Sequence, residues 1–422
     1  MVGRLSTIHK VYGYHGRLLI LDLGTRDWRE EALDAAVLRA FVGGTGLASY
    51  LLQRFCPPGA EPLSPGNPLI FVNSPLVGTA VTTSSKYTVI SKSPLTGFVG
   101  DSLSSSYLAV ELKKTGYDAI VITGQARDWS YVELTERGVT FHDAADLLGL
   151  DPVQTEVRVR ELLGDPRPRI AAIGVAGERA VRYATISNDG RHAGRTGTGA
   201  VMGAKRLKAL AVRGTLATEV AHPRELQAVR RELARRSLGH ATEKYRTMGT
   251  TANVSVFNRL GALPSYNFRQ STFEQIEAIS GERLHQQHHE RSVTCAGCGI
   301  GCEHLFRSGD TSSRMEYESL YALGPMCGIS DLENILQAAA LCDRYGLDTI
   351  STGATIAWAM ESAERGLIDA PGLRFGNGAA VLESIELIAG RQGLGDLLAE
   401  GSRAAAAHVG GGSDAWAMHV KG

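Results

Sequence analysis

The chain has 422 residues, of which 43% are hydrophobic and 21% are charged, a composition typical of a globular protein rather than a disordered one. Its 44 basic and 44 acidic residues give a formal net charge of zero, and the basic residues form no concentrated stripe, so we expect no nucleic-acid partner. Since the sequence shows neither a secretory signal nor an apolar run of about 18 residues, we also expect no membrane span and a cytoplasmic location.

The N-terminal half is predicted to be rich in strands. Helices are predicted from Leu38 to Arg54 and from Tyr107 to Lys114. Strands are predicted wherever a short apolar or β-branched run ends at Gly, Asn, Ser or Pro, namely over residues 16–25, 67–75, 86–93, 117–125, 169–177 and 207–215. Residues 1–214 are therefore predicted to form one domain with a large β-sheet component.

The character of the sequence changes at about residue 222, where charged amphipathic segments begin. We place a domain boundary between residues 214 and 222. The clearest helix covers residues 330–345, with a capping box of Ser330 and Glu333 at its start and Gly346 at its end. Further helices are predicted over residues 223–237, 348–366, 378–390 and 394–409. The length allows two to three domains. The predicted fold is α+β and multidomain, a strand-rich domain over 1–214 followed by an α-helical domain over 222–422.

Six cysteines are too few for a disulfide scaffold in a chain of this length, and half of them are clustered. The clustered ones follow the spacing C-x2-C-x3-C and are Cys295, Cys298 and Cys302. The intervening glycines, which lack steric bulk and tolerate positive φ, are Gly297, Gly299 and Gly301. Such a loop suits three corners of an iron–sulfur cluster whose fourth ligand is remote in sequence. A structural zinc site completed by His304 is the alternative.

The other cysteines have different surroundings. Cys327, in the segment GPMCGIS, is a candidate for the fourth cluster ligand. Cys56 precedes two prolines, and Cys342 lies on the apolar face of its predicted helix. We predict that Cys56 and Cys342 are small core residues.

Residues 188–212 form a glycine-rich segment with two arginines, Arg191 and Arg195. The glycine spacing G-x-G-x-x-x-G differs from the dinucleotide-binding fingerprint, and no acidic residue follows at the expected strand end. Small residues let backbone amides approach phosphate or pterin oxygens, and the arginines supply positive charge. The segment therefore favours an anionic ligand other than a dinucleotide, with a glycine-rich turn carrying solvated arginines as the alternative.

Seven segments in this order resemble the aldehyde ferredoxin oxidoreductase family of tungsten and molybdenum enzymes. They are GGTGLASYLL, SSKYTVISKSPLTGFVGDS, KKTGYDAIVITGQA, GRTGTGAVMGAKRLKALAV, CAGCGIGC, EYESLYALGPMCGI and CDRYGLDTISTGATIAWAMES. The likeness runs from about residue 10 to the final AWAMHVKG. It implies a tungsten or molybdenum ion held between two pterins, with associated Mg, beside a 4Fe-4S cluster. It also implies oxidation of an aldehyde substrate to a carboxylate with ferredoxin as electron acceptor, and formation of a homodimer is common among relatives.

The resemblance assigns roles to individual residues. Residues 1–214 would form a β-sheet saddle that carries the bis-pterin cofactor, and Lys86 would link pterin and cluster. The first three cluster ligands would be Cys295, Cys298 and Cys302. Pterin contacts would come from the segment 101–105 with Asp101 and Ser104, from Arg191, Ala193, Gly194 and Arg195, and from the D-x-x-G-L-D motif with Asp343, Gly346, Leu347 and Asp348.

Two carboxylates are candidates for catalysis. Glu318, in the segment EYES, matches the carboxylate that the family places near the metal. Attack on an aldehyde carbonyl needs a group that takes and returns a proton, and a carboxyl in a dry pocket can be tuned for this role. Glu316 is the second candidate, and an ordinary surface acid is its alternative interpretation.

The sequence departs from the family in two places. Leu103 occupies a position where the family has an asparagine that supports the magnesium, so we expect that contact to be lost or made by other groups. The chain ends at Gly422, whereas relatives continue with a second D-x-x-G-L motif, the fourth cluster cysteine and a histidine near the metal. We therefore expect a truncated or split subunit whose C-terminal domain belongs to a separate polypeptide, or a fragment.

Two alternative functions stay open at this point. The chain could be a non-catalytic remnant or assembly subunit that binds pterin and an iron–sulfur cluster. It could also be a molybdopterin oxidoreductase that uses Cys327 as the fourth cluster ligand. Those enzymes carry their cysteines near the start of the chain, whereas this chain carries them about two thirds of the way in.

Overall fold

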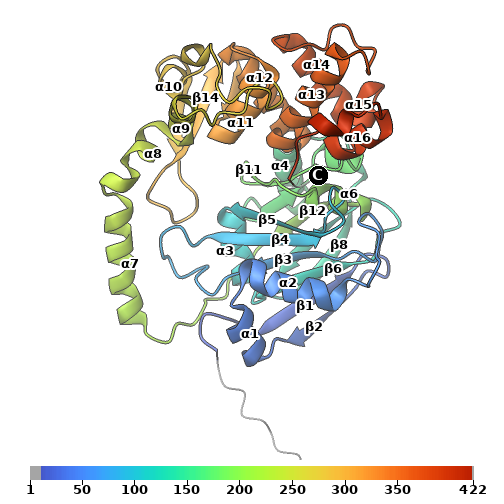
Figure 1. The fold of residues 1–422 in the computed structure, drawn as a ribbon. Coiled ribbons are helices and arrows are strands. Elements are labelled where there is room, and N and C mark those ends of the chain that lie inside the picture. The colour runs from blue at the N-terminus through green and yellow to red at the C-terminus, as the bar shows by residue number, and fades with distance from the viewer. Residues whose placement is uncertain (1–10, 421–422) are drawn as a thin grey trace, which may run out of the picture.

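A computed structural model of the chain describes residues 11–420. Strands dominate up to residue 212 and helices dominate beyond it, and the helical half lies on top of the sheets (Figure 1). This confirms the predicted fold class, in which a strand-rich N-terminal half precedes a mainly helical half. None of the helices in residues 11–420 is long and apolar enough to cross a membrane.

The N-terminal half contains two six-stranded sheets. Neighbouring strands run antiparallel except for the parallel pairs β1/β6 and β7/β12. The first sheet has the order β2-β1-β6-β3-β4-β5, with β1 (Arg17–Asp22), β2 (Asp27–Ala32), β3 (Leu69–Asn73), β4 (Lys86–Lys92), β5 (Val99–Ser105) and β6 (Ala119–Thr123). The second has the order β11-β10-β9-β12-β7-β8, with β7 (Ser130–Thr135), β8 (Gly138–Asp143), β9 (Arg169–Ala172), β10 (Ile186–Asn188), β11 (Arg191–Ala193) and β12 (Leu207–Val212).

The alternation of side chains along β1 shows how these sheets are layered. Leu19 and Leu21 belong to the core between the two sheets, whereas Leu18 and Ile20 point to the opposite face. That opposite face is covered by α1 (Ala35–Phe41) and α2 (Gly44–Phe55). The outer face of the second sheet packs against α4 (Pro152–Leu163) through Val159. Helices α3 (Tyr107–Lys114) and α6 (Thr198–Ala204) contribute side chains to the core between the sheets and contact strands of both. The remaining helix of this half is α5 (Val175–Glu178).

The helix predicted from Leu38 to Arg54 is in fact two helices, so that prediction was wrong. Val42 adopts a φ of 59°, which ends α1. The next residue, Gly43, passes so close to β3 that a Cβ there would lie 2.7 Å from the carbonyl oxygen of Asn73. The chain therefore turns at this point instead of continuing one helix.

The helical half contains α7 to α16 and a small three-stranded sheet that the sequence did not predict. The antiparallel sheet has the order β13-β14-β15, with β13 (His289–Val293), β14 (Glu303–Ser308) and β15 (Thr311–Arg314). The helices are α7 (Pro223–Ser237), α8 (Glu243–Met248), α9 (Asn253–Arg259), α10 (Gly281–His288), α11 (Tyr317–Leu323), α12 (Leu332–Tyr345), α13 (Thr349–Glu364), α14 (Gly378–Gly390), α15 (Leu394–Leu398) and α16 (Ser402–Val409).

Two details of the helix predictions differ from the structure. Helix α12 is capped by Asp331, whose carboxylate accepts a hydrogen bond from the backbone N–H of Glu333 at 3.0 Å, so the predicted capping box with Ser330 is wrong. It ends at Gly346 with a φ of 74°, as predicted. The single helix predicted over residues 394–409 is broken at Gly401, whose φ of 88° separates α15 from α16.

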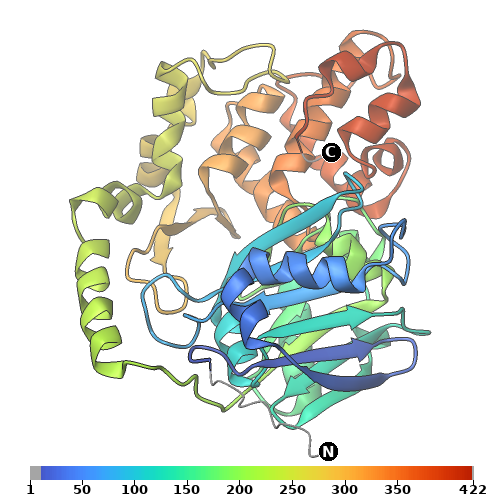
Figure 2. The same ribbon diagram turned by 60° about the horizontal axis from the view of Figure 1, so that its bottom comes forward.

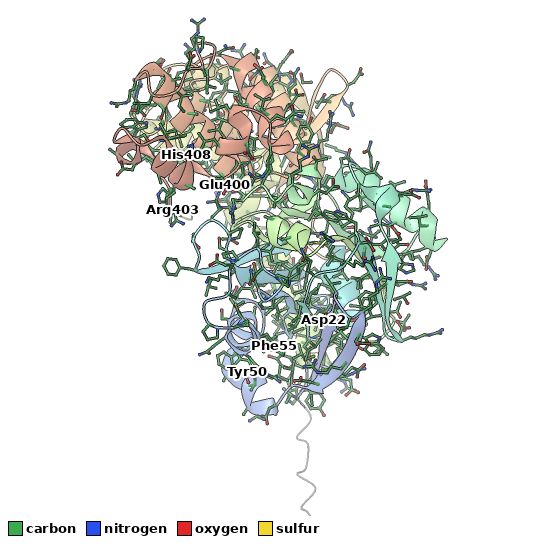
Figure 3. The ribbon with its side chains drawn as sticks, turned by 90° about the vertical axis from the view of Figure 1, so that its right-hand side faces the viewer. Asp22, Tyr50, Phe55, Glu400, Arg403 and His408 are labelled. Carbon is green, nitrogen blue, oxygen red and sulfur yellow. The ribbon has the colours of Figure 1, made fainter. Side chains whose placement is uncertain are left out.

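The two halves share one core and several polar contacts. Val181, Tyr183 and Ala184 of the N-terminal half pack in the same hydrophobic cluster as the helices. Figure 3 labels Glu400 and Arg403 on the side of the helical half that faces the sheets. Glu400 forms an ion pair with Arg182 at 2.9 Å, and Arg403 donates a hydrogen bond to the carbonyl of Leu95. These contacts fix one half on the other.

The connection between the halves runs along one side of the molecule. Residues 213–222 contain no helix or strand, and α7 follows them. Figures 1 and 2 both show α7 standing to the side of the sheets, and none of its residues is buried. Helices α8, α9 and α10 then precede the small sheet above.

Candidate functional site

A cavity of about 520 Å³ lies between the sheets and the helical half. Its walls combine both halves of the chain, because residues up to 195 come from the sheets and residues from 314 onward come from the helical half. The predicted site residues that line it are Lys86, Asp101, Ser104, Arg191, Gly194, Arg195, Glu316, Glu318, Asp343, Leu347 and Asp348. Five segments that are remote in sequence thus meet at one place.

The cavity floor is formed where the edge strands of the two sheets approach each other. β5 is the last strand of the first sheet, and β11 is the last strand of the second. The backbone N–H of Arg195 donates to the hydroxyl of Ser102 at 3.1 Å, and the amide of Asn188 donates to the hydroxyl of Ser104 at 3.3 Å. Because these bonds join β5 to β10 and to the segment that follows β11, the glycine-rich turn after β11 is held against β5.

The turn between α12 and α13 forms the wall on the helical side. Its backbone is bonded to the sheet half: the N–H of Thr185 donates to the carbonyl of Gly346 at 2.8 Å, and the N–H of Asp348 donates to the carbonyl of Tyr183 at 3.1 Å. The positive φ of Gly346 allows this turn to pass close to Gly174. The D-x-x-G-L-D motif therefore connects the two halves through backbone hydrogen bonds.

Asp348 has a second role as the N-cap of α13. Its carboxylate accepts hydrogen bonds from the backbone N–H groups of Ile350 at 3.2 Å and Ser351 at 3.3 Å. Thr349 and Ile350 line the cavity, so the positive end of the α13 dipole faces it. This end favours an anionic group in the cavity.

Two polar side-chain pairs cross from the sheets to the helices. Arg195 Nη1 lies 2.6 Å from Asp348 Oδ2, and His192 Nε2 lies 3.2 Å from Asp343 Oδ1. On its other side, His192 Nδ1 lies 2.9 Å from the hydroxyl of Thr185. His192 lies between two predicted residues but was not itself predicted, because the resemblance gave it no role.

The buried carboxylate of Glu303 holds the side chain of Arg191 in place. Glu303 is only 2% exposed and forms ion pairs with Arg191 and with Arg314. Arg314 also lines the cavity. Neither Glu303 nor Arg314 was predicted from the sequence, because both belong to the small sheet that the sequence did not reveal.

Glu316 and Glu318 face the cavity next to this cluster. Burial within the cavity raises the pKa of Glu316, Arg191 opposes this rise, and the nearby Glu318 adds to it. Glu318 lies in the first turn of α11, where a negative charge is stabilised by the helix dipole. Both carboxyls are therefore placed where they can exchange protons with a ligand in the cavity.

The cysteine loop joins β13 to β14 and hangs from the small sheet toward the loop that precedes β4 (Figure 1). A Cβ on Gly297 would lie 3.7 Å from the hydroxyl of Ser85, directly before Lys86. Gly297 and Gly301 have positive φ values of 67° and 64°. Gly299 does not adopt a positive φ, so two of the three intervening glycines use this freedom.

The thiols lie beside the charged wall of the cavity. The three clustered cysteines are half-buried. Burial raises the pKa of Cys295, and the positive charges of Arg191 and Lys86 oppose the rise. Burial also raises the pKa of Cys302, again against the effect of Arg191. Arg191 therefore acts electrostatically on both the thiols and the cavity.

Some candidate residues lie elsewhere. Ala193 is fully buried behind the cavity floor, and Gly346 acts through its backbone. Leu103 lines the cavity with 52% of its surface exposed, so it presents an apolar side chain at the position discussed for magnesium. Cys342 is a core residue, as predicted, and Cys56 packs at the edge of a core.

Cys327 lies in the core of the helical half, and its Sγ lies 3.5 Å from the carbonyl oxygen of Gly353 and 3.6 Å from that of Ala322. Burial raises the pKa of its thiol to about 12. A metal ligand must be a thiolate, which this environment disfavours. The structure thus gives Cys327 the features of a core residue.

The donor set fits a pterin cofactor with anionic substituents. Carboxylates of Asp343 and Asp348 can accept hydrogen bonds from a pterin ring, and the cations Arg191 and Arg195 can bind phosphate groups. The cavity volume lies within the range of about 300–1,000 Å³ that is common for cofactor sites. The positive end of α13 adds to the preference for an anion.

Comparison with known proteins gives a consistent result. The family profile described as aldehyde ferredoxin oxidoreductase, N-terminal domain, matches residues 18–214, and the profile for domains 2 and 3 matches residues 227–422. The chain is 41% identical over 407 residues to the tungsten-containing aldehyde ferredoxin oxidoreductase of Pyrococcus furiosus, covering 93% of this chain and 67% of the relative. It is 40% identical to the enzyme of the same name from Thermococcus kodakarensis, with the same coverage of 93% and 67%.

More distant relatives carry other names. The WOR-like subunit of the aliphatic sulfonate oxidoreductase of Pyrococcus furiosus is 32% identical, with 98% of this chain and 70% of the relative covered. Among solved structures, the active site complex BamBC of benzoyl coenzyme A reductase, in complex with 1,5-dienoyl-CoA, matches with a TM-score of 0.87 and 30% identity. That match covers 97% of this chain and 65% of the other, so the chain spans about two thirds of the length of such relatives.

Proposed function

Because the chain belongs to the aldehyde ferredoxin oxidoreductase family, we propose that its cavity holds a tungsten or molybdenum bis-pterin cofactor and that its cysteine loop holds a 4Fe-4S cluster. In this proposal the protein takes part in oxidising aldehydes to carboxylates, with ferredoxin as the electron acceptor. Tungsten is favoured over molybdenum, since the relatives at 40% identity and above are named as tungsten-containing.

The observation that carries the proposal is the position of Arg191 between the cavity and the thiols. It lines the cavity, it forms an ion pair with the buried Glu303, and its charge acts on Cys295 and Cys302. An electron carrier at the thiols and a redox cofactor in the cavity would thus be direct neighbours. Lys86 lies at the same boundary.

The chain's own residues would hold the cofactor and handle protons. Arg191 and Arg195 would bind its anionic groups, and Asp343 and Asp348 would accept hydrogen bonds from its pterin rings. When bound, the metal and its pterins supply the two-electron redox chemistry. Oxidation of an aldehyde to a carboxylate consumes one water, so a proton must leave that water, and Glu318 or Glu316 would accept it.

The chain spans about two thirds of the length of its relatives, so the proposal concerns this chain together with the residues that correspond to the remaining third. These residues belong either to the same polypeptide or to a separate C-terminal one, and they would supply the fourth cluster ligand. A homodimer is compatible with the proposal. The Mg ion of the family would need ligands other than the side chain of Leu103.

Metal analysis of the anaerobically purified protein tests this function. We expect tungsten or molybdenum together with about four iron atoms per chain. Cys298→Ser should lose most of the iron, whereas the matched change Cys56→Ser, at a thiol far from the loop in sequence, should keep it. A wild-type preparation without iron and without either metal, even when produced with the residues of the remaining third, would refute the proposal.

The alternative functions give different outcomes in the same experiment. A preparation with full metal and iron content that oxidises no aldehyde would favour a non-catalytic subunit. Iron lost in Cys327→Ser, with folding retained, would favour Cys327 as a cluster ligand and hence a molybdopterin oxidoreductase. We expect Cys327→Ser to keep its iron, because its thiol lies in the helical core.

A further inference from the structure

A second group of metal-ligating side chains lies outside the cavity, at the base of the cysteine loop. His285 belongs to the last turn of α10, His289 begins β13 and His304 lies in β14. Each offers one ring nitrogen, and these three nitrogens lie within 4.8 Å of one another. In the antiparallel pair of β13 and β14, Ser292 lies opposite His304. The end of a helix and two paired strands therefore bring the imidazoles together.

The ring nitrogens have poor hydrogen-bond partners. His285 Nδ1 is buried, and no hydrogen-bond partner is found for it among the residues that the structure describes. Within residues 11–420, His289 Nε2 and His304 Nδ1 each reach the hydroxyl of Ser292 alone, at 3.4 Å in both cases. Such distances are long for a hydrogen bond. The three imidazoles thus lie close together with few strong hydrogen-bond partners.

The remaining nitrogen of His304 is held as in a ligating histidine. His304 is only 1% exposed, and its Nε2 lies 3.3 Å from the carbonyl oxygen of Tyr245. Since a carbonyl only accepts, this contact places the proton on Nε2 and leaves Nδ1 with the lone pair that a metal ion needs. A backbone carbonyl that orients a ligating imidazole in this way is a common feature of metal sites.

We propose that His285, His289 and His304 bind a divalent cation of the zinc type. Three imidazoles suit Zn²⁺ and its neighbours in the first transition series, and a water would take the fourth position. Zinc–nitrogen bonds of about 2.1 Å in a tetrahedral site separate the nitrogens by about 3.4 Å. The widest present separation of 4.8 Å must therefore shrink, which rotation of the two partly exposed rings, His285 and His289, can provide.

The bound ion would fix the base of the cysteine loop. β13 and β14 flank residues 294–302, so a metal held by His289 and His304 ties the two ends of the loop together. His285 ties both strands to α10. None of the three histidines lines the cavity, so the proposal does not depend on the proposed redox function.

Titration with Co²⁺, a spectroscopic substitute for Zn²⁺, tests the site. The clustered thiols also bind such ions, so the titration uses the chain in which Cys295, Cys298 and Cys302 are all replaced by Ser. We expect one Co²⁺ per chain, with visible absorption of a nitrogen-rich tetrahedral site and no thiolate charge-transfer band. Addition of Zn²⁺ should displace the Co²⁺.

Single histidine variants identify the ligands. His289→Gln and His285→Gln should each weaken Zn²⁺ binding by at least about 100-fold, as measured by competition with a chromogenic chelator. The matched control His240→Gln changes an exposed histidine that pairs with Glu243 and should leave binding unchanged. Far-UV circular dichroism checks that each variant is folded. His304→Gln is less suitable, because its buried side chain supports the fold.

Two results would overturn the proposal. One is the absence of stoichiometric Co²⁺ binding, at micromolar concentrations, by the folded chain that lacks the three clustered cysteines. The other is equal Zn²⁺ affinity of His289→Gln, His285→Gln and the control. Hydrogen exchange gives an independent readout. In the chain that lacks the three clustered cysteines, Zn²⁺ should slow exchange in residues 294–302, and it should not do so when His289→Gln is added.

Discussion

The buried carboxylate of Glu303 offers a direct test of how the site is held together. Glu303 is 2% exposed and forms ion pairs with Arg191 and Arg314. Glu303→Gln keeps the size of the side chain but removes its charge. It leaves two guanidinium groups, with side chains only 20% and 24% exposed, facing a neutral amide.

The expected loss follows from the burial of this cluster. Removing one partner of a buried ion pair costs about 3–5 kcal/mol. Both arginines keep some contact with solvent through the cavity, so we expect a value of about 3 kcal/mol, at the lower end of that range. Since whole domains are stable by about 5–15 kcal/mol, this is a large fraction of the total. Urea unfolding measures it as a shift of the midpoint at constant slope.

The matched control lies in the same small sheet. Glu290 pairs with Arg307 and with the hydroxyl of Ser312 at the surface. Glu290→Gln makes the same chemical change but should leave the midpoint close to that of the wild type, because exposed pairs contribute little. If Glu303→Gln also unfolds within about 0.5 kcal/mol of the wild type, the buried cluster does not stabilise the fold as we reason.

Three further predictions concern the walls of the cavity and the helices behind it. Asp348→Ala should lower the free energy of unfolding by about 1–2 kcal/mol through loss of the α13 N-cap, and further through loss of the ion pair with Arg195. Asp348→Asn should lose the ion pair but keep the cap. Urea unfolding of both variants separates the two contributions. Gly353→Ala would place a Cβ 2.1 Å from the carbonyl oxygen of Ala322, so α11 and α13 must separate and we expect a loss of at least about 1–3 kcal/mol in thermal unfolding. Gly372→Ala, whose Cβ would meet nothing within 4 Å, is the control and should behave as the wild type. Burial raises the pKa of the Glu316 carboxyl, so the stability that protonated Glu316 contributes is lost as the pH rises from about 4.5 through the higher folded-state pKa. Glu316→Gln should lack this part of the pH dependence. Identical curves of stability against pH for the wild type and Glu316→Gln would contradict the prediction.

The strands that were predicted correctly are those with an apolar run in their own sequence. β1, β3 and β12 are buried apolar runs with clear ends, so each was found within a few residues. β2 has the sequence DWREEA, is mostly exposed and lies at the edge of its sheet. Its strand conformation depends on pairing with β1 and not on an apolar pattern, which is why the sequence did not reveal it.

The candidate site follows the same division between local and long-range signals. The cysteine spacing and the D-x-x-G-L-D motif are local, and the resemblance pointed to their residues. The ion pair of Arg195 with Asp348 joins positions 153 residues apart, and only the packing of the two halves creates it. The same holds for Glu303 and Arg314. No local pattern distinguishes them from other charged residues, and only the small sheet brings them together with Arg191.

Arg191 links the thiols and the cavity electrostatically, and this has a consequence for the redox chemistry that we propose. Its charge acts on Cys295, Cys302 and Glu316, and it is itself held by the buried Glu303. Cys302 and Glu316 also interact directly through their charges, so a change of charge at the thiols alters the electrostatic environment of Glu316. Electron transfer to a cluster at the thiols would then raise the proton affinity of Glu316. Uptake of a proton by Glu316 would then be coupled to transfer of an electron from the cavity to the cluster, and no movement of the chain would be needed.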